Sequence, residues 1–526
     1  MDTQLMNAGA NMFKWQERSM GGWAPKWVHE PSVAAIKSIA RREFDISIAG
    51  TRSNSDLETR PTLSSSGSFK KLYKDEVSAS ERDLPTRLLL NDSGQFRSQN
   101  DISDVKVTFF ANGSFNKLYQ VEIPDSPKAF LMRIPLPIDP WFKTRSEVFT
   151  IETVRRLTSL SLPSILSYCA DTRNDLHLEW FLMDMLPGQT LWSLWRSLSM
   201  KQKEDVVKNI AQLHVDLFNA RWSSIGSLGT SDANLSNDGI TETTGINSSN
   251  KTAGNQIHKS IHASNLSDQD IEEINSKKPT QCDSIFPLGP VVQQAFSLAS
   301  RIQAKTQRGP FLSDHDWIHA LLMVSIQTHE QDLESSDDEG TREDAEIYAE
   351  VAKKLLDILP MVFPPTEPTT TCLVHHDLSF NNIMIDKTGR ITGIIDWECV
   401  STLPLWRACQ LPKLLTGGAR DEMPNPMIYG DTDEEDSKSL RNFCMPVSDN
   451  LGKNSLYWRH LLDWEKTKMT ETFMIEMDRL APEWRQIQET SQMKMEFIEL
   501  VEDVAACAYA EDILEWIQDF NDAFTR

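Results

Sequence analysis

Positive charge is scarce in this sequence of 526 residues. It contains 53 Lys and Arg against 76 Asp and Glu, which gives a formal net charge of −23. Binding to nucleic acid or to an anionic membrane needs clustered cations, so we expect neither as a general partner of this chain. The composition is still compatible with a small, local phosphate site.

Paired cysteines and long apolar runs are also missing. The seven cysteines are scattered, and no two stand two or three residues apart, which argues against a zinc site or a disulfide framework. We therefore expect a reducing compartment. No apolar run approaches the roughly 18–20 residues of a membrane helix, and the N-terminus lacks a secretory pattern. We predict a cytoplasmic protein without integral membrane contact, and a mitochondrial location is not excluded.

Apolar residues are fewer than a compact chain needs. They make up 40% of the sequence, whereas compact domains usually have roughly 45–50%. Two polar stretches rich in Ser, Thr, Asn and Asp account for the deficit: residues 51–104 predict a disordered linker, and about 230–280 a disordered insertion. Residues 1–50 predict a helical N-terminal element, because Val33, Ile36 and Ile39 have helical spacing.

A meander of short strands is expected to begin near residue 105. The segments 105–110, 115–123 and 129–134 are rich in Val, Phe, Tyr and Ile, and turn residues separate them. A helix follows over 145–160, whose apolar residues fit one face. Further strands are predicted at 165–169 and 176–183, and helices at 192–198 and 201–220.

The residues with the clearest chemistry lie between 372 and 398. Asp377 and Asn382 stand five apart in a polar loop before a short strand, and Asp396 follows the returning strand of a hairpin. This places two carboxylates and an amide around one small space. Phosphoryl transfer uses such a set, with a carboxylate to orient the attacking hydroxyl and oxygen ligands for magnesium. An Asp and an Asn in one surface turn are common, but the second carboxylate one hairpin later favours the functional interpretation.

These residues resemble the aminoglycoside phosphotransferase family of the protein-kinase-like superfamily. The family pattern is His-x-Asp-x4-Asn followed by Ile-Asp-Trp/Phe-Glu, and this chain has His375-His376-Asp377, Asn382 and Ile395-Asp396-Trp397-Glu398. Further segments resemble its fungal members. The resemblance implies an α+β, protein-kinase-like two-lobed fold. Residues 105–186 would form a small nucleotide-binding lobe with an antiparallel sheet, and 187–526 a larger, mainly helical lobe.

The resemblance extends to the proposed small lobe. It implies that ATP phosphates are covered by the turn after the first strand, formed by Gly113, Ser114 and Phe115. Arg133 stands where kinases usually have the lysine that contacts the α- and β-phosphates, and Glu147 would pair with it. Glu152 is the alternative partner of Arg133, and a plain surface salt bridge is the structural alternative. Arginine is bulkier than lysine, which raises the chance of weak catalysis.

The segment between the lobes resembles the family's hinge. Backbone groups of Asp184, Met185 and Leu186 would meet adenine there, although a strand ending in a Pro-Gly turn describes the same residues. His214 is expected in the core, and His375 is expected to support the catalytic loop by a buried hydrogen bond rather than act as a base.

The resemblance implies an ATP-dependent phosphotransferase that moves the γ-phosphate to a hydroxyl of a small molecule. Asp377 would orient the hydroxyl and accept its proton, and Asn382 and Asp396 would hold Mg²⁺. The acidic runs 332–344 and 431–436 are compatible with a cationic acceptor. The alternatives are a catalytically weak, pseudokinase-like nucleotide-binding scaffold, or a protein kinase. The oligomeric state is not determined by the sequence.

Overall fold

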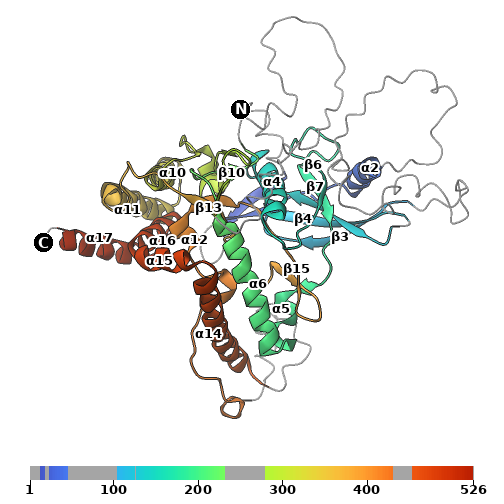
Figure 1. The fold of residues 1–526 in the computed structure, drawn as a ribbon. Coiled ribbons are helices and arrows are strands. Elements are labelled where there is room, and N and C mark those ends of the chain that lie inside the picture. The colour runs from blue at the N-terminus through green and yellow to red at the C-terminus, as the bar shows by residue number, and fades with distance from the viewer. Residues whose placement is uncertain are drawn as a thin grey trace, which may run out of the picture.

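The computed structural model describes residues 12–17, 23–44, 104–124, 126–230, 279–430 and 453–524. The predicted linker 51–104 and insertion 230–280 lie outside these residues, apart from their last or first positions. Figure 1 shows a sheet with two flanking helices, joined to a larger helical part that ends at the C-terminus. The predicted α+β two-lobed fold is therefore confirmed.

The small lobe is built on a five-stranded antiparallel sheet in the order β3-β4-β5-β7-β6. Its strands are β3 (Lys106–Asn112), β4 (Asn116–Glu122), β5 (Ala129–Pro135), β6 (Ile165–Cys169) and β7 (Trp180–Asp184). The helix α4 (Phe142–Leu157) packs on one face through Val148, Ile151 and Val154. Strand β7 begins at Trp180, four residues after the predicted start at 176. The residues before it form a turn, in which Asn174 Nδ2 donates to the carbonyls of Asp171 (2.6 Å) and Leu178 (2.8 Å).

The N-terminal residues belong to the core of the small lobe. A hairpin of β1 (Phe13–Glu17) and β2 (Trp23–Trp27), which the sequence did not predict, precedes the helix α2 (Val33–Glu43). Ile36 and Ile39 of α2 are fully buried against the sheet, in a cluster that contains Met132 of β5. The neighbouring Leu131 packs with α4 instead. Since successive side chains of a strand point to opposite faces, α2 and α4 cover opposite faces of the sheet.

This burial makes a prediction for stability. Ile39→Ala is expected to lower the free energy of unfolding by about 2–5 kcal/mol, because it leaves a cavity under α2. Urea denaturation of the full chain measures the loss. Val33→Ala, at a position that is 47% exposed on the same helix, is the matched control. Equal effects of the two substitutions would show that α2 does not contribute to the core.

The large lobe contains two groups of long helices. In Figure 1, α6 (Met200–Asn219) lies beside α14 (Ser455–Leu480), which is followed by α15 (Pro482–Thr490). The second group surrounds its own apolar core and comprises α10 (Asp314–Ser335), α11 (Glu339–Val362), α16 (Gln492–Ala506) and α17 (Ala510–Phe524). Within the acidic run 332–344, only residues 336–338 lie outside these helices, and Asp338 caps α11 by accepting from the Thr341 amide at 2.8 Å.

Short strands position the residues around 377. Strand β13 (Thr371–Val374) pairs with β16 (Ser401–Pro404), and β14 (Ile383–Ile385) forms the predicted hairpin with β15 (Ile391–Ile394). The remaining short elements are β8 (Gln189–Thr190), α5 (Leu191–Leu194), β9 (Ala220–Arg221), β10 (Ser227–Leu228), β11 (Thr280–Gln281), β12 (Leu288–Gly289), α9 (Gln294–Ser297) and α12 (Leu405–Ala408).

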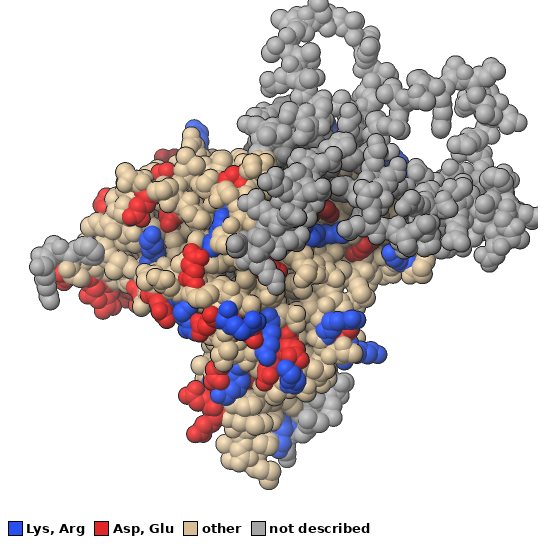
Figure 2. All heavy atoms as spheres, in the orientation of Figure 1, with Lys and Arg blue, Asp and Glu red and all other residues tan. Residues whose placement is uncertain are grey.

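On the described part of the face in Figure 2, Lys and Arg are interspersed with Asp and Glu and form no continuous basic stripe. No described helix has the length and apolar character needed to cross a membrane. The cysteines among the described residues form no disulfide with one another.

Candidate active site

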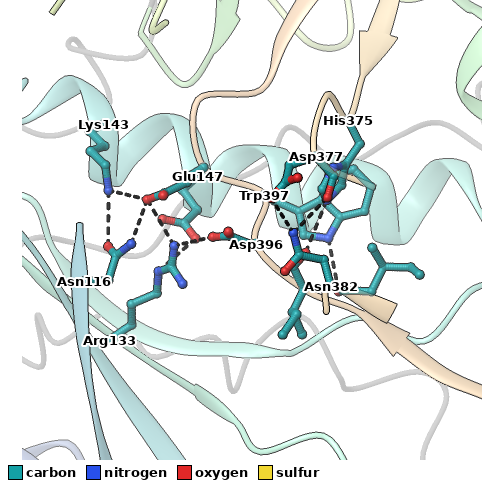
Figure 3. A network of polar contacts seen from close by, with 12 residues as sticks. Asn116, Arg133, Lys143, Glu147, His375, Asp377, Asn382, Asp396 and Trp397 are labelled. Atoms are coloured by element: carbon teal, nitrogen blue, oxygen red, sulfur yellow. Dashed lines mark hydrogen bonds and ion pairs between the residues drawn. The ribbon is translucent and has the colours of Figure 1, made fainter. Parts of the chain in front are cut away.

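The loop between β13 and β14 fixes the position of Asp377. Asn382 Nδ2 donates to the Asp377 backbone carbonyl at 2.8 Å and to its Oδ2 at 2.9 Å. The two side chains point toward each other in Figure 3. The Asp377 side chain is 41% exposed, so its carboxylate can meet a molecule from solvent. The predicted Asp/Asn pair is therefore one hydrogen-bonded unit.

His375 supports this loop from inside the protein. Its Nε2 lies 3.2 Å from the Ile395 carbonyl oxygen, and its ring meets the Trp397 ring edge-on at 4.5 Å between centroids. Burial lowers the pKa of His375. This imidazole is therefore neutral at pH 7, and its contacts match the predicted supporting role.

Asn382 and Asp396 lie at the same end of the hairpin. The Ile395 amide donates to the Asn382 carbonyl at 2.9 Å, and Asp396 follows directly. Asp396 has a left-handed backbone (φ 68°), a conformation that non-glycine residues adopt most often as Asp or Asn. Among the described residues, no group of three or more His, Cys, Asp or Glu could hold a metal. The amide and carboxylate suit Mg²⁺, which usually takes few protein ligands and completes its shell with phosphate and water.

Arg133 of β5 connects the two lobes. Its Nη2 donates to Asp396 Oδ1 at 2.8 Å and to Glu398 Oε2 at 3.1 Å. Its Nε lies 3.1 Å from Glu147 Oε1, so the predicted partner of Arg133 is in contact with it (Figure 3). Glu152, the alternative partner, lies near Arg155 instead, at 3.7 Å.

Three further members of this network were missed by the sequence analysis. Lys143 Nζ lies 2.6 Å from Glu398 Oε2 and donates to Asn116 Oδ1 at 3.2 Å. Asn116 Nδ2 in turn donates to Glu398 Oε2 at 2.8 Å. Two signals could have found them: Lys143 stands one helical turn before Glu147 on α4, and Glu398 ends the Ile-Asp-Trp-Glu motif.

We call this set of six residues, from both lobes, the interlobe network: Asn116, Arg133, Lys143, Glu147, Asp396 and Glu398. It contains two cations and three carboxylates, and most of its side chains are buried. Burial raises the pKa of Glu147, because its carboxylate is cut off from water. Burial opposes ionisation of Glu398 as well, but Lys143 and Arg133 hold its pKa at about 2.

The predicted phosphate loop and hinge are partly engaged within the protein. The Gly113 amide donates to the Asn116 carbonyl at 2.8 Å, so of the three loop residues Ser114 and Phe115 are the better candidates for phosphate contacts. In the predicted hinge, the Asp184 amide donates to the Ser164 carbonyl at 3.0 Å, and the Met185 amide donates to the Ala129 carbonyl at 3.3 Å. The Leu186 side chain packs over Gly393. Two of the three amides of the predicted hinge are therefore engaged within the protein.

Another residue missed by the sequence analysis, Lys413, contacts Asp377. Lys413, in the 3-10 turn Lys413–Leu415, places its Nζ 2.7 Å from Asp377 Oδ1. It stands 36 residues after Asp377, outside any motif, and nothing in the local sequence signals the contact. The two oxygens of the Asp377 carboxylate therefore have different partners.

The family of the chain follows from a comparison with family models. Residues 106–406, more than half of the chain, match the model of the phosphotransferase enzyme family. The chain belongs to this family. The matched phosphotransferase region contains β3 to α12 and so includes Asp377, Asn382 and the whole interlobe network.

Fungal proteins are among the curated relatives of this chain. Two subtelomeric hrmA-associated cluster proteins of Aspergillus fumigatus are 23% and 26% identical over 319 residues, which is 53% of this chain and 54% of each relative. The chain thus spans about half the length of these relatives. The mitochondrial protein "altered inheritance of mitochondria protein 9" of Meyerozyma guilliermondii is 30% identical over 88 residues, which is 16% of this chain and 14% of that protein.

Solved structures of phosphotransferases are also similar. The similarity to a putative aminoglycoside phosphotransferase from Ralstonia eutropha extends over 79% of this chain and 93% of that protein's chain (TM-score 0.31, 11% identity). The aminoglycoside phosphotransferase APH(4)-Ia covers 80% and 94% (TM-score 0.32, 15% identity). Both scores are below 0.5, so this likeness adds nothing to the family match.

A partly buried histidine, His214, predicts an effect of pH on stability. Burial lowers the pKa of His214 to about 4, and its ring meets the Phe473 ring at 5.3 Å. In the unfolded chain His214 binds a proton near pH 6.5, whereas in the folded chain it binds one only near pH 4. Lowering the pH from 6.5 to 4 therefore favours the unfolded chain and lowers the free energy of unfolding. His214→Phe should therefore lose roughly 2–3 kcal/mol less stability than the parent between pH 7 and 4.5.

Urea denaturation at several pH values measures this difference. The comparison is made between variant and parent, because burial raises the pKa of Glu179 to about 7 and that group contributes a slope of opposite sign. His319→Phe, at an exposed position of α10, is the control. Identical pH profiles of His214→Phe and the parent would contradict the prediction.

Proposed function

We propose that this chain is an ATP-dependent phosphotransferase that moves the γ-phosphoryl group to a hydroxyl of a small molecule. One observation carries the proposal: the Asp377 carboxylate, held by Asn382 and open to solvent, lies in a chain of the phosphotransferase family. In this proposal ATP lies between the lobes and the acceptor approaches Asp377 from the large lobe. The cytoplasm is the proposed compartment.

Each residue has a role in the proposed reaction. Asp377 orients the acceptor hydroxyl and accepts its proton while the hydroxyl oxygen bonds to the γ-phosphorus and ADP leaves. Asn382 and Asp396 would hold Mg²⁺, which supplies positive charge next to the phosphates. Arg133 binds the α- and β-phosphates, and the turn at Gly113, Ser114 and Phe115 covers them.

The alternative is a catalytically weak nucleotide-binding scaffold. It is favoured by the contact of Arg133 with Asp396, because this ion pair joins the proposed phosphate-binding residue to the proposed metal ligand. Nucleotide binding would have to exchange this pair for phosphate and metal contacts. A protein side chain as acceptor is a further alternative, which no contact in the described residues favours.

Two measurements test the proposal. Isothermal titration with ATP, with and without Mg²⁺, is expected to show binding that depends on the metal. A screen of hydroxyl-bearing metabolites with ³²P-labelled ATP then identifies the acceptor by transfer of the label. Binding of ATP that is independent of Mg²⁺, without transfer or hydrolysis, would favour the scaffold, and absence of ATP binding would overturn both.

A further inference from the structure

Lys413 lies beside the proposed base but comes from a different part of the chain. Its side chain is 60% exposed, and its Nζ has no second hydrogen bond or ion pair among the described residues. An exposed ion pair contributes only about 0–1 kcal/mol to stability. The contact with Asp377 therefore adds little to stability, and it leaves the ammonium group open to a molecule from solvent.

The backbone around Lys413 is firmly held against the catalytic loop. The Leu414 amide donates to the carbonyl of Leu378, the residue after Asp377, at 3.0 Å. Leu414 and Leu415 are buried at 1% and 5% exposure, and the Leu415 amide closes the turn on Pro412 at 2.8 Å. The backbone of Lys413 is thus held in place, because the next residue bonds to the catalytic loop, whereas its exposed side chain can move.

The two carboxylate oxygens of Asp377 bond to different partners on different sides of the carboxylate. Oδ2 accepts from Asn382 inside the loop, whereas Oδ1 accepts from the exposed Lys413. A carboxylate has about four lone-pair sites, so Oδ1 can accept a hydroxyl as well as the ammonium group. A hydroxyl oxygen bonded to Oδ1 would lie about 4–5 Å from Nζ, because both groups are within hydrogen-bond distance of the same atom. Any group that bonds to the hydroxyl oxygen then comes within reach of Lys413.

We propose that Lys413 is a catalytic residue that donates a hydrogen bond to the γ-phosphoryl group during transfer; this rests on the proposed function. The bond between the hydroxyl oxygen and the γ-phosphorus forms as the bond to the bridging oxygen of ADP breaks, and the hydroxyl proton passes to Asp377. Two N–H groups of Nζ are left to bond an equatorial phosphoryl oxygen. A cation at this place also disfavours a positive group beside the hydroxyl, contrary to the cationic acceptor suggested by the acidic runs.

The test uses the full chain with Lys413→Gln and Lys413→Arg. Hydrolysis of Mg·ATP, with water as acceptor, measures transfer without knowledge of the natural acceptor. Fluorescence of mant-ADP measures affinity for ADP with Mg²⁺, before and after addition of aluminium fluoride, which mimics the transferring group. Lys353→Gln is the matched control, because Lys353 is 55% exposed and lies 2.9 Å from Glu330 on the helices α10 and α11.

We expect Lys413→Gln to lower hydrolysis by about 10²-fold, the usual effect of losing one donor to a transition-state oxyanion. Its affinity for ADP should be unchanged, and the gain in affinity with aluminium fluoride should be lost. Lys413→Arg should recover part of both losses, because it restores the charge. Lys353→Gln should match the parent.

The outcomes separate this inference from the function on which it rests. If the parent binds and hydrolyses ATP while Lys413→Gln keeps both the rate and the aluminium fluoride effect, the role of Lys413 is wrong and the proposed function stands. If Lys413→Gln weakens ADP binding as much as it slows hydrolysis, Lys413 holds the nucleotide rather than the transferring group, and the inference is overturned. A parent that binds no nucleotide overturns the proposed function and this inference together.

Discussion

Replacement of Asp377 by asparagine is expected to lower phosphoryl transfer by about 10²–10⁴-fold, the contribution of a positioned general base. The amide has the shape of the carboxylate but cannot take the hydroxyl proton. The initial rate of ADP release from Mg·ATP, with water or with an acceptor found by screening, measures the loss. Affinity for the nucleotide should change little, since the proposed phosphate contacts are made by other residues.

The fold of the Asp377→Asn variant should be intact, because the side chain is 41% exposed. Thermal unfolding checks this. Asp205→Asn is the matched control: Asp205 is exposed and lies 2.7 Å from Lys201, the same distance as that between Asp377 and Lys413. A full rate in Asp377→Asn would show that this carboxylate is not the base.

The largest effect on stability is expected from Glu398→Ala. Glu398 Oε2 is the common partner of Arg133, Lys143 and Asn116. Its removal leaves two buried cations short of a counter-charge, which typically costs about 3–5 kcal/mol. Urea denaturation of the full chain measures the change in the free energy of unfolding.

An exposed ion pair on the sheet of the small lobe provides the control. Glu122 lies 3.1 Å from Lys106, and both side chains are largely exposed, so Glu122→Ala should cost less than about 1 kcal/mol. Adding Lys143→Met to Glu398→Ala should recover part of the loss, because one unpaired charge is removed with its partner. A loss in Glu398→Ala no larger than in Glu122→Ala would mean that the interlobe network does not stabilise the fold.

The elements that the sequence predicted well are those with local signals. The strands β3, β4 and β5 are rich in Val, Phe, Tyr and Ile and are separated by turn residues, so they were predicted within a few residues. The hairpin of β14 and β15 follows from the turn at Asp386 and Gly389. The packing of α2 on the sheet could not be predicted, because its partners, such as Met132, are nearly a hundred residues away.

The candidate site divides in the same way. Asp377 and Asn382 share one short loop, so their spacing alone implied that they meet. Arg133 and Glu147 were paired through the family resemblance, and the structure places them in contact. Lys143 was overlooked although it stands one helical turn before Glu147 on α4. Lys413 was missed because a single lysine in a sequence has no pattern, and its importance depends on what the tertiary fold places beside it.

The packing of α2 has a consequence for the stretch of chain that follows it. Arg41 of α2 bonds to Asp104 at 2.8 Å, just before β3, so the chain leaves and re-enters the small lobe at one place. For a connection whose ends are held together, the entropy of closure grows only with the logarithm of length. Shortening this connection from about 60 to about 20 residues would change that cost by about 1 kcal/mol. The number of residues in this connection therefore has little effect on the stability of the small lobe.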